Sequence, residues 1–129
     1  MLLINAWVGP SEIHGFGLIA HQFIPKGTVV WKLEPGFDLV ISEDEFKKLP
    51  LTGQKIVNHY GFFHPILERH VLCSDDDRFT NHSDTANVKF HGDHAIAIRD
   101  IHEGEEITDN YTEFGKPIHS NTRPVMNTL

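Results

Sequence analysis

One stretch decides how the whole sequence is interpreted: Arg78-Phe79-Thr80-Asn81-His82-Ser83-Asp84-Thr85-Ala86-Asn87. Its first six residues place a guanidinium, an amide, an imidazole and a hydroxyl close together, directly after the acidic run at 75–77. Such a density of polar groups is typical of a functional site. The alternative is a polar turn, because Asn and Ser side chains readily bond to their own backbone. Spacing alone leaves both interpretations open.

Two further segments flank this stretch, and each is ambiguous by itself. His14-Gly15-Phe16-Gly17-Leu18 has glycines at alternate positions, which permit positive φ and a close approach to a ligand, but turns between strands use the same residues. The segment lacks the helix and the downstream acid of a dinucleotide-binding site. Gly104-Glu105-Glu106-Ile107-Thr108-Asp109-Asn110-Tyr111 predicts a turn and a short strand that ends near a tyrosine. A tyrosine in that place is more often a half-buried packing residue than a catalytic group.

Hydrophobic alternation and Gly/Pro punctuation predict short antiparallel strands along most of the chain. The expected strands cover 4–8, 18–21, 28–33, 71–73, 87–90 and 95–98. The turn at 91–94 should join the last two strands into a hairpin. Ser42 with Glu45 has the form of a capping box, which predicts a helix that runs to about Leu49, before Pro50. A second helix is expected over 53–60.

Length, composition and charge limit the class of protein. The 129 residues fit one domain, and 40% hydrophobic against 22% charged residues predicts a folded core. Eleven Lys and Arg against eighteen Asp and Glu give a net charge of −7, which disfavours direct nucleic-acid binding and favours a basic partner. Cys73, the single cysteine, excludes an intrachain disulfide. No leader segment and no apolar run of bilayer length is found, so a soluble protein without a membrane partner is expected.

Taken together, the three segments resemble the signature of the SET-domain family. The family's glycine motif is similar to residues 14–20, and its Arg-Phe-x-Asn-His-Ser-Cys-x-Pro-Asn motif is similar to residues 78–87. Its Gly-Glu-Glu-Leu-Thr-Tyr-Asp-Tyr motif is similar to residues 104–111. The order and spacing of the three segments agree with those of the family over about residues 4–115. The sequence resembles a compact form of the domain, without the cysteine-rich segment that often follows it.

The resemblance implies a fold and a set of boundaries. The fold class is mainly β, with several small antiparallel sheets, one or two short helices and a knot-like threading of the C-terminal segment through the Asn-His-Ser segment. Residues 1–115 would form the SET domain. Residues 116–129 would form a C-terminal tail that serves as a lid over cofactor or substrate.

The resemblance also implies an activity: transfer of a methyl group from S-adenosylmethionine to a lysine amine of a basic protein or peptide. Tyr111 would be the catalytic tyrosine. The residues expected to hold S-adenosylmethionine are Gly15, Phe16, Gly17, Arg78, Asn81, His82 and Phe114. Tyr60 and Asp109 would contact the substrate. The enzyme would work inside a cell, in the cytoplasm or in a nucleus, including that of a host.

Four positions depart from the family pattern. Asp84 and Ala86 stand where the family usually has Cys and Pro, and Asp109 and Asn110 replace the Tyr-Asp that precedes the last tyrosine. Asp109 makes the expected lysine channel more polar. It therefore supports an alternative function, a non-catalytic SET-fold module that binds a peptide or S-adenosylmethionine.

Histidine-rich composition raises a third class, a metal-binding or structural protein. The chain has ten histidines, and the pairs His91 with His94 and His59 with His64 could each touch one metal ion. No HExxH or facial-triad pattern accompanies them. Most of the ten are expected at the surface or in turns, and no metal is assigned.

Overall fold

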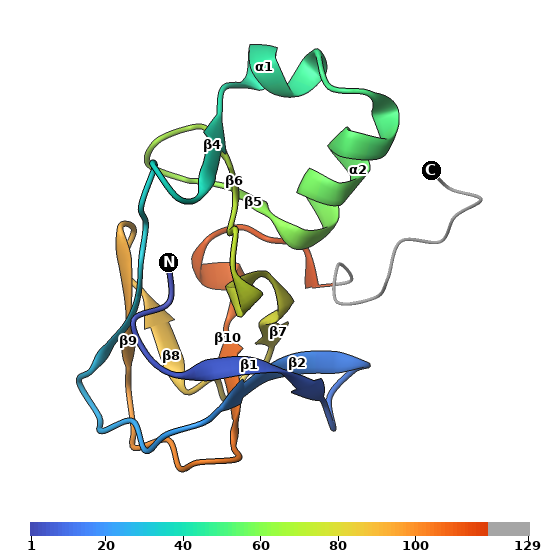
Figure 1. The fold of residues 1–129 in the computed structure, drawn as a ribbon. Helices are drawn as coiled ribbons and strands as arrows, with labels where there is room; N and C mark the ends of the chain where they lie inside the picture. Colours follow the sequence, from blue (N-terminus) through green and yellow to red (C-terminus); the bar gives the residue numbers. More distant parts are fainter. Residues whose placement is uncertain (119–129) are drawn as a thin grey trace.

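The computed structural model describes residues 1–118, and short strands dominate it (Figure 1). These residues form ten strands in three small sheets, with two α-helices and two short 3-10 helices. The predicted class, mainly β with several small sheets and short helices, is confirmed. The predicted elements are found with boundaries that differ by two residues at most.

The first sheet brings the three sequence motifs together. Its strand order is β1-β2-β10-β7, with β1 at Ala6–Pro10, β2 at Phe16–Ala20, β7 at Asn81–His82 and β10 at Glu106–Asp109. Strand β10 lies antiparallel to β2 and parallel to β7, so Thr108 pairs with Asn81 and Asp109 with His82. The parallel pair differs from the antiparallel pairing that was predicted. No tight turn joins β7 to β10, because a complete hairpin intervenes, and their relative direction is therefore free.

The hairpin between β7 and β10 belongs to the second sheet. Its strand order is β3-β9-β8, with β3 at Val29–Lys32, β8 at Val88–Phe90 and β9 at His94–Ala97. The turn between β8 and β9 is the one expected from the sequence. Gly92 adopts φ 90°, and the His91 N–H donates to the His94 carbonyl at 2.8 Å.

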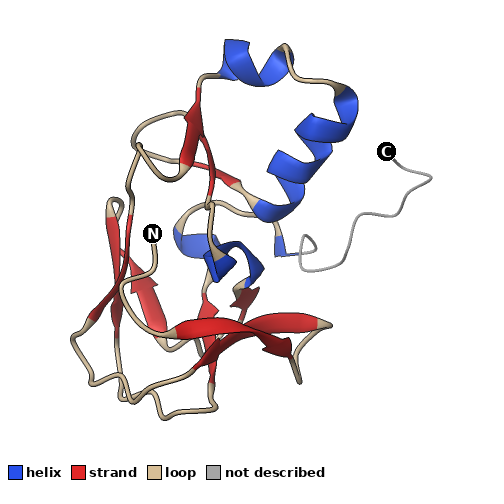
Figure 2. Cartoon of the chain, in the orientation of Figure 1, coloured by secondary structure: helices blue, strands red, loops and turns tan. Residues whose placement is uncertain are grey.

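The third sheet and the helices form the other end of the molecule, which Figure 2 shows with both helices in blue beside this sheet. Its strand order is β4-β6-β5, with β4 at Leu39–Ile41, β5 at Phe62–Phe63 and β6 at His70–Leu72. Helix α1 spans Glu43–Lys47, and α2 spans Leu51–Tyr60 and lies against β5 and β6. Both bonds of the predicted capping box are present, from Glu45 N to Ser42 Oγ and from Ser42 N to Glu45 Oε1.

Two short 3-10 helices, η1 at Asp76–Phe79 and η2 at Tyr111–Glu113, connect this framework to the site. A buried apolar cluster fixes the sheets below them. Its largest fully buried members are Leu18, Ile24, Val71 and Ile101. The Asn87 side chain anchors β10, because its Oδ1 accepts from Thr108 N at 2.9 Å and its Nδ2 donates to Glu106 O at 2.8 Å. None of the helices among the described residues is long and apolar enough to span a bilayer.

Candidate functional site

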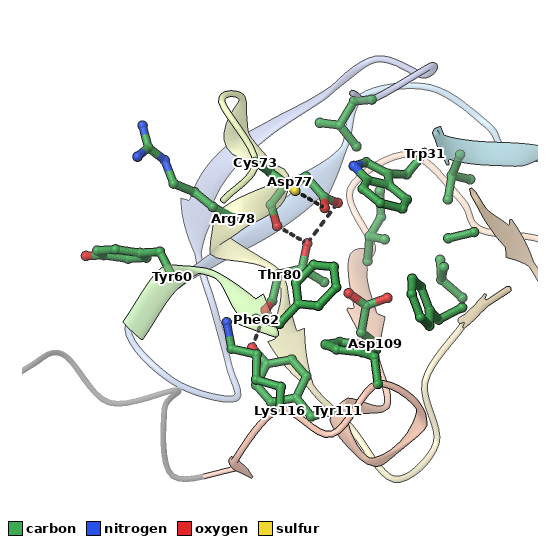
Figure 3. A pocket seen from close by; sticks show the side chains of 17 residues that line it. Trp31, Tyr60, Phe62, Cys73, Asp77, Arg78, Thr80, Asp109, Tyr111 and Lys116 are labelled. Atoms are coloured by element: carbon green, nitrogen blue, oxygen red, sulfur yellow. Dashed lines mark hydrogen bonds between the residues drawn. The ribbon is translucent and has the colours of Figure 1, made fainter. Parts of the chain in front are cut away.

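A cavity lies where η1, β10 and η2 meet the sheet of β3, β9 and β8 (Figure 3). Its walls are mostly apolar and aromatic. The aromatic side chains that line it are Trp31, Tyr60, Phe62, Phe90, Tyr111 and Phe114. Carboxyl groups come from Asp77 and Asp109, and an amine comes from Lys116. An aromatic chamber with carboxylates is suited to a cation, which both kinds of group attract.

Tyr111 lies at the centre of the contacts around this cavity. Its side chain is buried, and its hydroxyl donates a hydrogen bond to the Thr80 carbonyl, which closes η1 against η2. Burial, followed by the nearby charge of Asp109, raises the pKa of Tyr111 above its ordinary value. The hydroxyl therefore stays protonated near neutral pH and offers its lone pairs, not an anion, to the cavity.

His82 holds the backbone of Tyr111 in place. The Tyr111 N–H donates to His82 Nδ1 at 3.0 Å, and His82 Nε2 lies 2.9 Å from Asp84 Oδ1. Because Nδ1 accepts a hydrogen bond, the ring proton belongs on Nε2, from which it is donated to the carboxylate. Asp84, which replaces the cysteine of the family pattern, thus orients this imidazole.

Asp77 and Asp109 are two acids that face one cavity. Burial, followed by the charge of Asp75, raises the pKa of Asp77 to about 6, and its Oδ1 accepts from the Thr80 hydroxyl at 3.3 Å. Burial, followed by the charge of Asp77, raises the pKa of Asp109 well above its ordinary value. A cation that entered the cavity would favour the ionised form of both carboxyls.

Lys116 brings such a cation from the chain itself. Only 9% of its surface is exposed, and its Nζ lies 5.1 Å from the centre of the Tyr111 ring. Burial lowers the pKa of this amine to about 8, although the negative charge of Asp109 acts in the opposite direction. A larger fraction of the amine is therefore neutral near pH 8 than for an exposed lysine.

Beside this cavity, the glycine segment is held to β10 by Asn81. Asn81 Nδ2 lies 3.0 Å from the Phe16 carbonyl oxygen and 2.9 Å from Glu106 Oε2. A Cβ at Gly17 would lie 2.4 Å from Glu106 Oε2 and 3.0 Å from Asn81 Nδ2, so these two side chains would have to shift if position 17 were not glycine. Gly15 adopts φ +49°, which favours glycine. Side-chain bonds from one amide thus fix the backbone of the whole glycine segment.

The model of the SET domain family matches residues 15–112, which cover all three motifs. The chain belongs to the SET domain family. Enzymes of this family generally transfer a methyl group from S-adenosylmethionine to lysine. No sequence among curated proteins matches the chain.

Solved structures agree with the SET fold. A Plasmodium falciparum protein described as a histone methyltransferase matches with a TM-score of 0.60 and 17% identity, over 85% of this chain and 95% of that one. Two structures of the Chaetomium thermophilum Polycomb Repressive Complex 2, one with an inhibitor and one an apo form mutated in Ezh2, also match. Their TM-scores are 0.60 and 0.62, with 24% and 26% identity. Each match covers 86% of this chain but 15% of the other.

The SET-domain framework separates the predicted site residues into two groups. Five line the cavity: Tyr60, Arg78, Asp109, Tyr111 and Phe114. The other five lie beside it, in the glycine segment and β7: Gly15, Phe16, Gly17, Asn81 and His82. The Phe16 side chain is 61% exposed, whereas Phe114 is buried with its ring 5.1–5.7 Å from those of Phe62, Phe90 and Tyr111.

Several lining residues were not predicted from the sequence. Trp31 and Phe90 come from expected strands with an ordinary apolar pattern, and Phe62 comes from β5, which was not expected as a strand. Nothing therefore distinguished these three side chains from core residues. Lys116 was assigned to the C-terminal tail, which was expected to act as a lid. Residues 119–129, most of that tail, lie outside the described residues. Gly115 at φ 72° reverses the chain just before Lys116. That glycine is the one local signal that could have indicated a return toward Tyr111.

The residues around the cavity fit S-adenosylmethionine in two respects. Its sulfonium cation suits the aromatic and acidic walls. Two buried donors, Trp31 Nε1 and Arg78 Nε, have no hydrogen-bond partner within residues 1–118, so polar groups of a ligand could satisfy them. In Figure 3 the end of the Arg78 guanidinium points away from the cavity, and it lies over the Phe79 ring at 5.7 Å.

The histidine pairs have structural partners. His64 Nε2 lies 3.0 Å from the Gly92 carbonyl, and its Nδ1 accepts from the backbone of Ile66 and Leu67, so the buried ring is fully bonded. The rings of His91 and His94 stack on each other across the hairpin turn. Over residues 1–118, no three His, Cys, Asp or Glu side chains are grouped in a way that could hold a metal ion.

Proposed function

We propose that this SET domain is an S-adenosylmethionine-dependent methyltransferase that modifies a lysine amine of a basic protein or peptide. The observation that supports it most is the buried Tyr111 hydroxyl, bonded to the Thr80 carbonyl at an aromatic and acidic cavity. Two oxygens at the edge of an apolar chamber suit a reaction in which a carbon passes from sulfur to nitrogen. Such a reaction depends on alignment and desolvation more than on acid or base strength.

The cavity would prepare the lysine in three ways. Asp77 and Asp109 attract the ammonium form of the side chain, and either carboxylate can accept the proton that must leave before reaction. The aromatic walls exclude water and so favour the neutral amine. The lone pairs of Tyr111 Oη and Thr80 O can then orient that amine and accept weak C–H···O contacts.

Cofactor binding is assigned to the residues that carry the family motifs. Gly15, Phe16 and Gly17 would offer backbone groups, with Asn81 and His82 beside them and Arg78 and Phe114 at the cavity wall. When bound, S-adenosylmethionine supplies an electrophilic methyl group. Because the Asn81 amide nitrogen is already bonded to the Phe16 carbonyl, its contribution is to hold the glycine segment in its binding shape.

The charge of the protein favours a basic substrate. A net charge of −7 and acidic groups in the cavity favour a lysine within a basic sequence, and Tyr60 and Asp109 are proposed to contact it. Since one solved neighbour is described as a histone methyltransferase, a histone is the first protein to test. Cytoplasm and nucleus are both proposed locations. Residues 1–115 are proposed as the catalytic domain and 116–129 as its lid.

Asp109 supports a rival function. It stands where the family motif has a tyrosine, and a carboxylate there could make the domain a non-catalytic module that binds a peptide or S-adenosylmethionine. Calorimetry with S-adenosylmethionine tests cofactor binding. The enzyme and a cofactor-binding module both predict binding, whereas a module that binds only a peptide does not. Transfer of a labelled methyl group to histones separates the enzyme from the module.

Tyr111→Phe tests the role of the hydroxyl while it keeps the ring. Loss of one oriented oxygen at the transition state should lower the rate of methyl transfer about 10- to 100-fold. The matched control is Thr112→Val, which removes an exposed hydroxyl one residue later in η2. Transfer that is equally fast in all three proteins would rule out the proposed role of Tyr111, and absence of transfer in the wild type would leave only the binding module.

A further inference from the structure

Lys116 is a lysine whose side chain already lies in the cavity where the proposed function requires a lysine. It lines the same cavity as Asp109 and Tyr111 and is 9% exposed. We propose that Lys116 is an intramolecular methyl acceptor, which this SET domain modifies in its own active site before or in competition with a partner protein. The inference rests on the proposed methyltransferase function and adds a modification site to it.

The backbone around Lys116 fixes the direction of the side chain. Helix η2 ends at Glu113, and Gly115 turns the chain back at φ 72°. The Lys116 N–H then donates to the Tyr111 carbonyl at 3.0 Å, and the side chain crosses the Tyr111 ring with Nζ 5.1 Å from its centre. In Figure 3 the Lys116 amine lies on the side of Tyr111 where its hydroxyl bonds to Thr80. The amine thus lies over the Tyr111 ring, in the cavity that Tyr111 and Thr80 also line.

The surroundings of the amine favour the reactive form. Burial lowers the pKa of Lys116 to about 8, and the groups that oppose this shift are Asp109, Cys73 and Asp77. Because burial outweighs those charges, a substantial fraction of the amine is neutral at pH 8. An exposed lysine would be almost fully protonated at that pH.

The step itself balances with S-adenosylmethionine as the only co-reactant. The lone pair of Lys116 Nζ forms a bond to the methyl carbon as the carbon–sulfur bond breaks, and that electron pair stays on sulfur as a thioether. The proton that the alkylated nitrogen must lose passes to the Asp109 carboxylate or to water. No oxidant, reductant or metal is needed.

Mass spectrometry of the full chain tests the inference. The purified protein is incubated with S-adenosylmethionine at pH 8, alone or with histone, and methylated lysines are then located by peptide mapping. Methyl groups are expected on Lys116, and the fraction of protein modified per unit time should not depend on protein concentration, as for an intramolecular reaction. Lys116→Arg should lose this modification, whereas Lys89→Arg, at an exposed lysine on β8, should keep it.

The outcomes separate this inference from the proposed function. If histone is methylated while Lys116 stays unmodified, the inference is wrong and the methyltransferase function stands. If the fraction of Lys116 modified per unit time rises with protein concentration, the reaction is intermolecular and the inference is wrong again. If neither protein gains a methyl group, both proposals fail.

A second measurement needs no cofactor and no turnover. In the NMR spectrum the Tyr111 ring should shift the side-chain methylene protons of Lys116 upfield, and the amine should titrate with a midpoint near 8. An unshifted signal that titrates at about 10.4, as an ordinary lysine does, would place the amine outside the cavity and overturn the inference.

Discussion

At Asn81 one side-chain nitrogen links β7 to two segments that are far apart in the sequence, residues 11–16 and strand β10. It lies within hydrogen-bond distance of Ser11 Oγ, the Phe16 carbonyl and Glu106 Oε2, and only 4% of the residue is exposed. Every one of these atoms can accept a hydrogen bond from an amide, so a side chain that cannot donate leaves the part-buried Phe16 carbonyl and Glu106 carboxylate without this donor.

Asn81→Asp should therefore be strongly destabilising at neutral pH. The new carboxylate would face the Glu106 carboxylate, and the single Ser11 hydroxyl could not donate to both, at an expected cost of about 2–3 kcal/mol in the free energy of unfolding. Urea unfolding at pH 7 measures the loss. The matched control, Asn110→Asp, should change little, because the Asn110 amide oxygen serves as an acceptor for Thr112. Addition of Glu106→Gln to the Asn81→Asp protein restores a donor and should recover part of the loss, and no recovery would contradict the assigned contact.

Asp77 should make the protein less stable as the pH rises. A salt-bridged acid has the opposite effect. Its pKa is raised from 3.8 to about 6, so the folded state holds its proton more tightly than the unfolded chain does. The stabilisation is complete below pH 4 and is lost as the pH rises through 6. Relative to Asp77→Asn, the wild type should lose about 2 kcal/mol between pH 4 and 7.5.

Urea unfolding at the two pH values measures this difference. Asp76→Asn, the same change one residue earlier in η1, is the control for the loss of one negative charge. If the wild type and Asp77→Asn lose stability equally between the two pH values, the carboxyl group of Asp77 does not titrate in the way assigned here.

At the scale of elements, the junction between α2 and β5 has no room for a side chain. A Cβ on Gly61 would lie 2.3 Å from the Val71 carbonyl oxygen and 2.6 Å from the Val57 carbonyl oxygen. Both are backbone atoms, held by β6 and by the last turn of α2, so they cannot move aside as a flexible side chain could. Helix α2 and strand β6 therefore approach each other closely at this glycine.

Gly61→Ala is expected to lower the free energy of unfolding by about 2 kcal/mol or more, because the backbone of β6 or α2 must shift. Gly36→Ala is the matched control, since its Cβ would meet no atom within 4 Å and its φ is not positive. Thermal unfolding of the two variants measures the difference. Equal unfolding temperatures would mean that the two elements can separate without cost.

The elements also show which features a sequence can reveal. Helix α1 was predicted because its capping box is a local pattern, and the hairpin of β8 and β9 because Gly92 marks its turn. Strands β4, β5 and β7 were missed, because none of these short segments has a pattern that sets it apart from a loop. The pairing of β10 with β7 joins residues 27 positions apart, Thr108 with Asn81 and Asp109 with His82, and no local pattern encodes it.

The site follows the same division. Tyr111, Arg78 and Asp109 were predicted because they belong to short motifs of a known family, and all three line the cavity. Trp31 and Phe90 were not, because an aromatic residue on a strand has the same pattern whether it faces a core or a chamber. Lys116 depends on the turn at Gly115, whose direction only the folded chain defines.

At the scale of the whole molecule, excess negative charge should speed the encounter with a basic substrate. The net charge is −7, and acidic residues also line the cavity itself. Attraction between a basic peptide and this surface acts over about a Debye length, roughly 10 Å at 0.1 M salt, so added salt should weaken it.

The KM for a basic lysine peptide is therefore expected to rise several-fold between about 0.05 and 0.5 M salt, with little change in kcat. Steady-state methyl transfer at a series of salt concentrations measures it. A peptide with the same central lysine but no other charges is the control and should show a nearly constant KM. A parallel rise for both peptides would show that salt acts on the domain and not on charge attraction.

The central place of β10 in the first sheet has a consequence for how the protein matures during synthesis. Strands β1, β2 and β7 leave the ribosome long before β10, yet β10 must lie between β2 and β7 to join them. Until residues 106–109 emerge, β2 and β7 have no strand between them to pair with, so the glycine segment and the Asn-His segment are not joined in one sheet. A nascent chain should thus bring these two segments together late and abruptly, and chaperones would meet an exposed sheet edge until then.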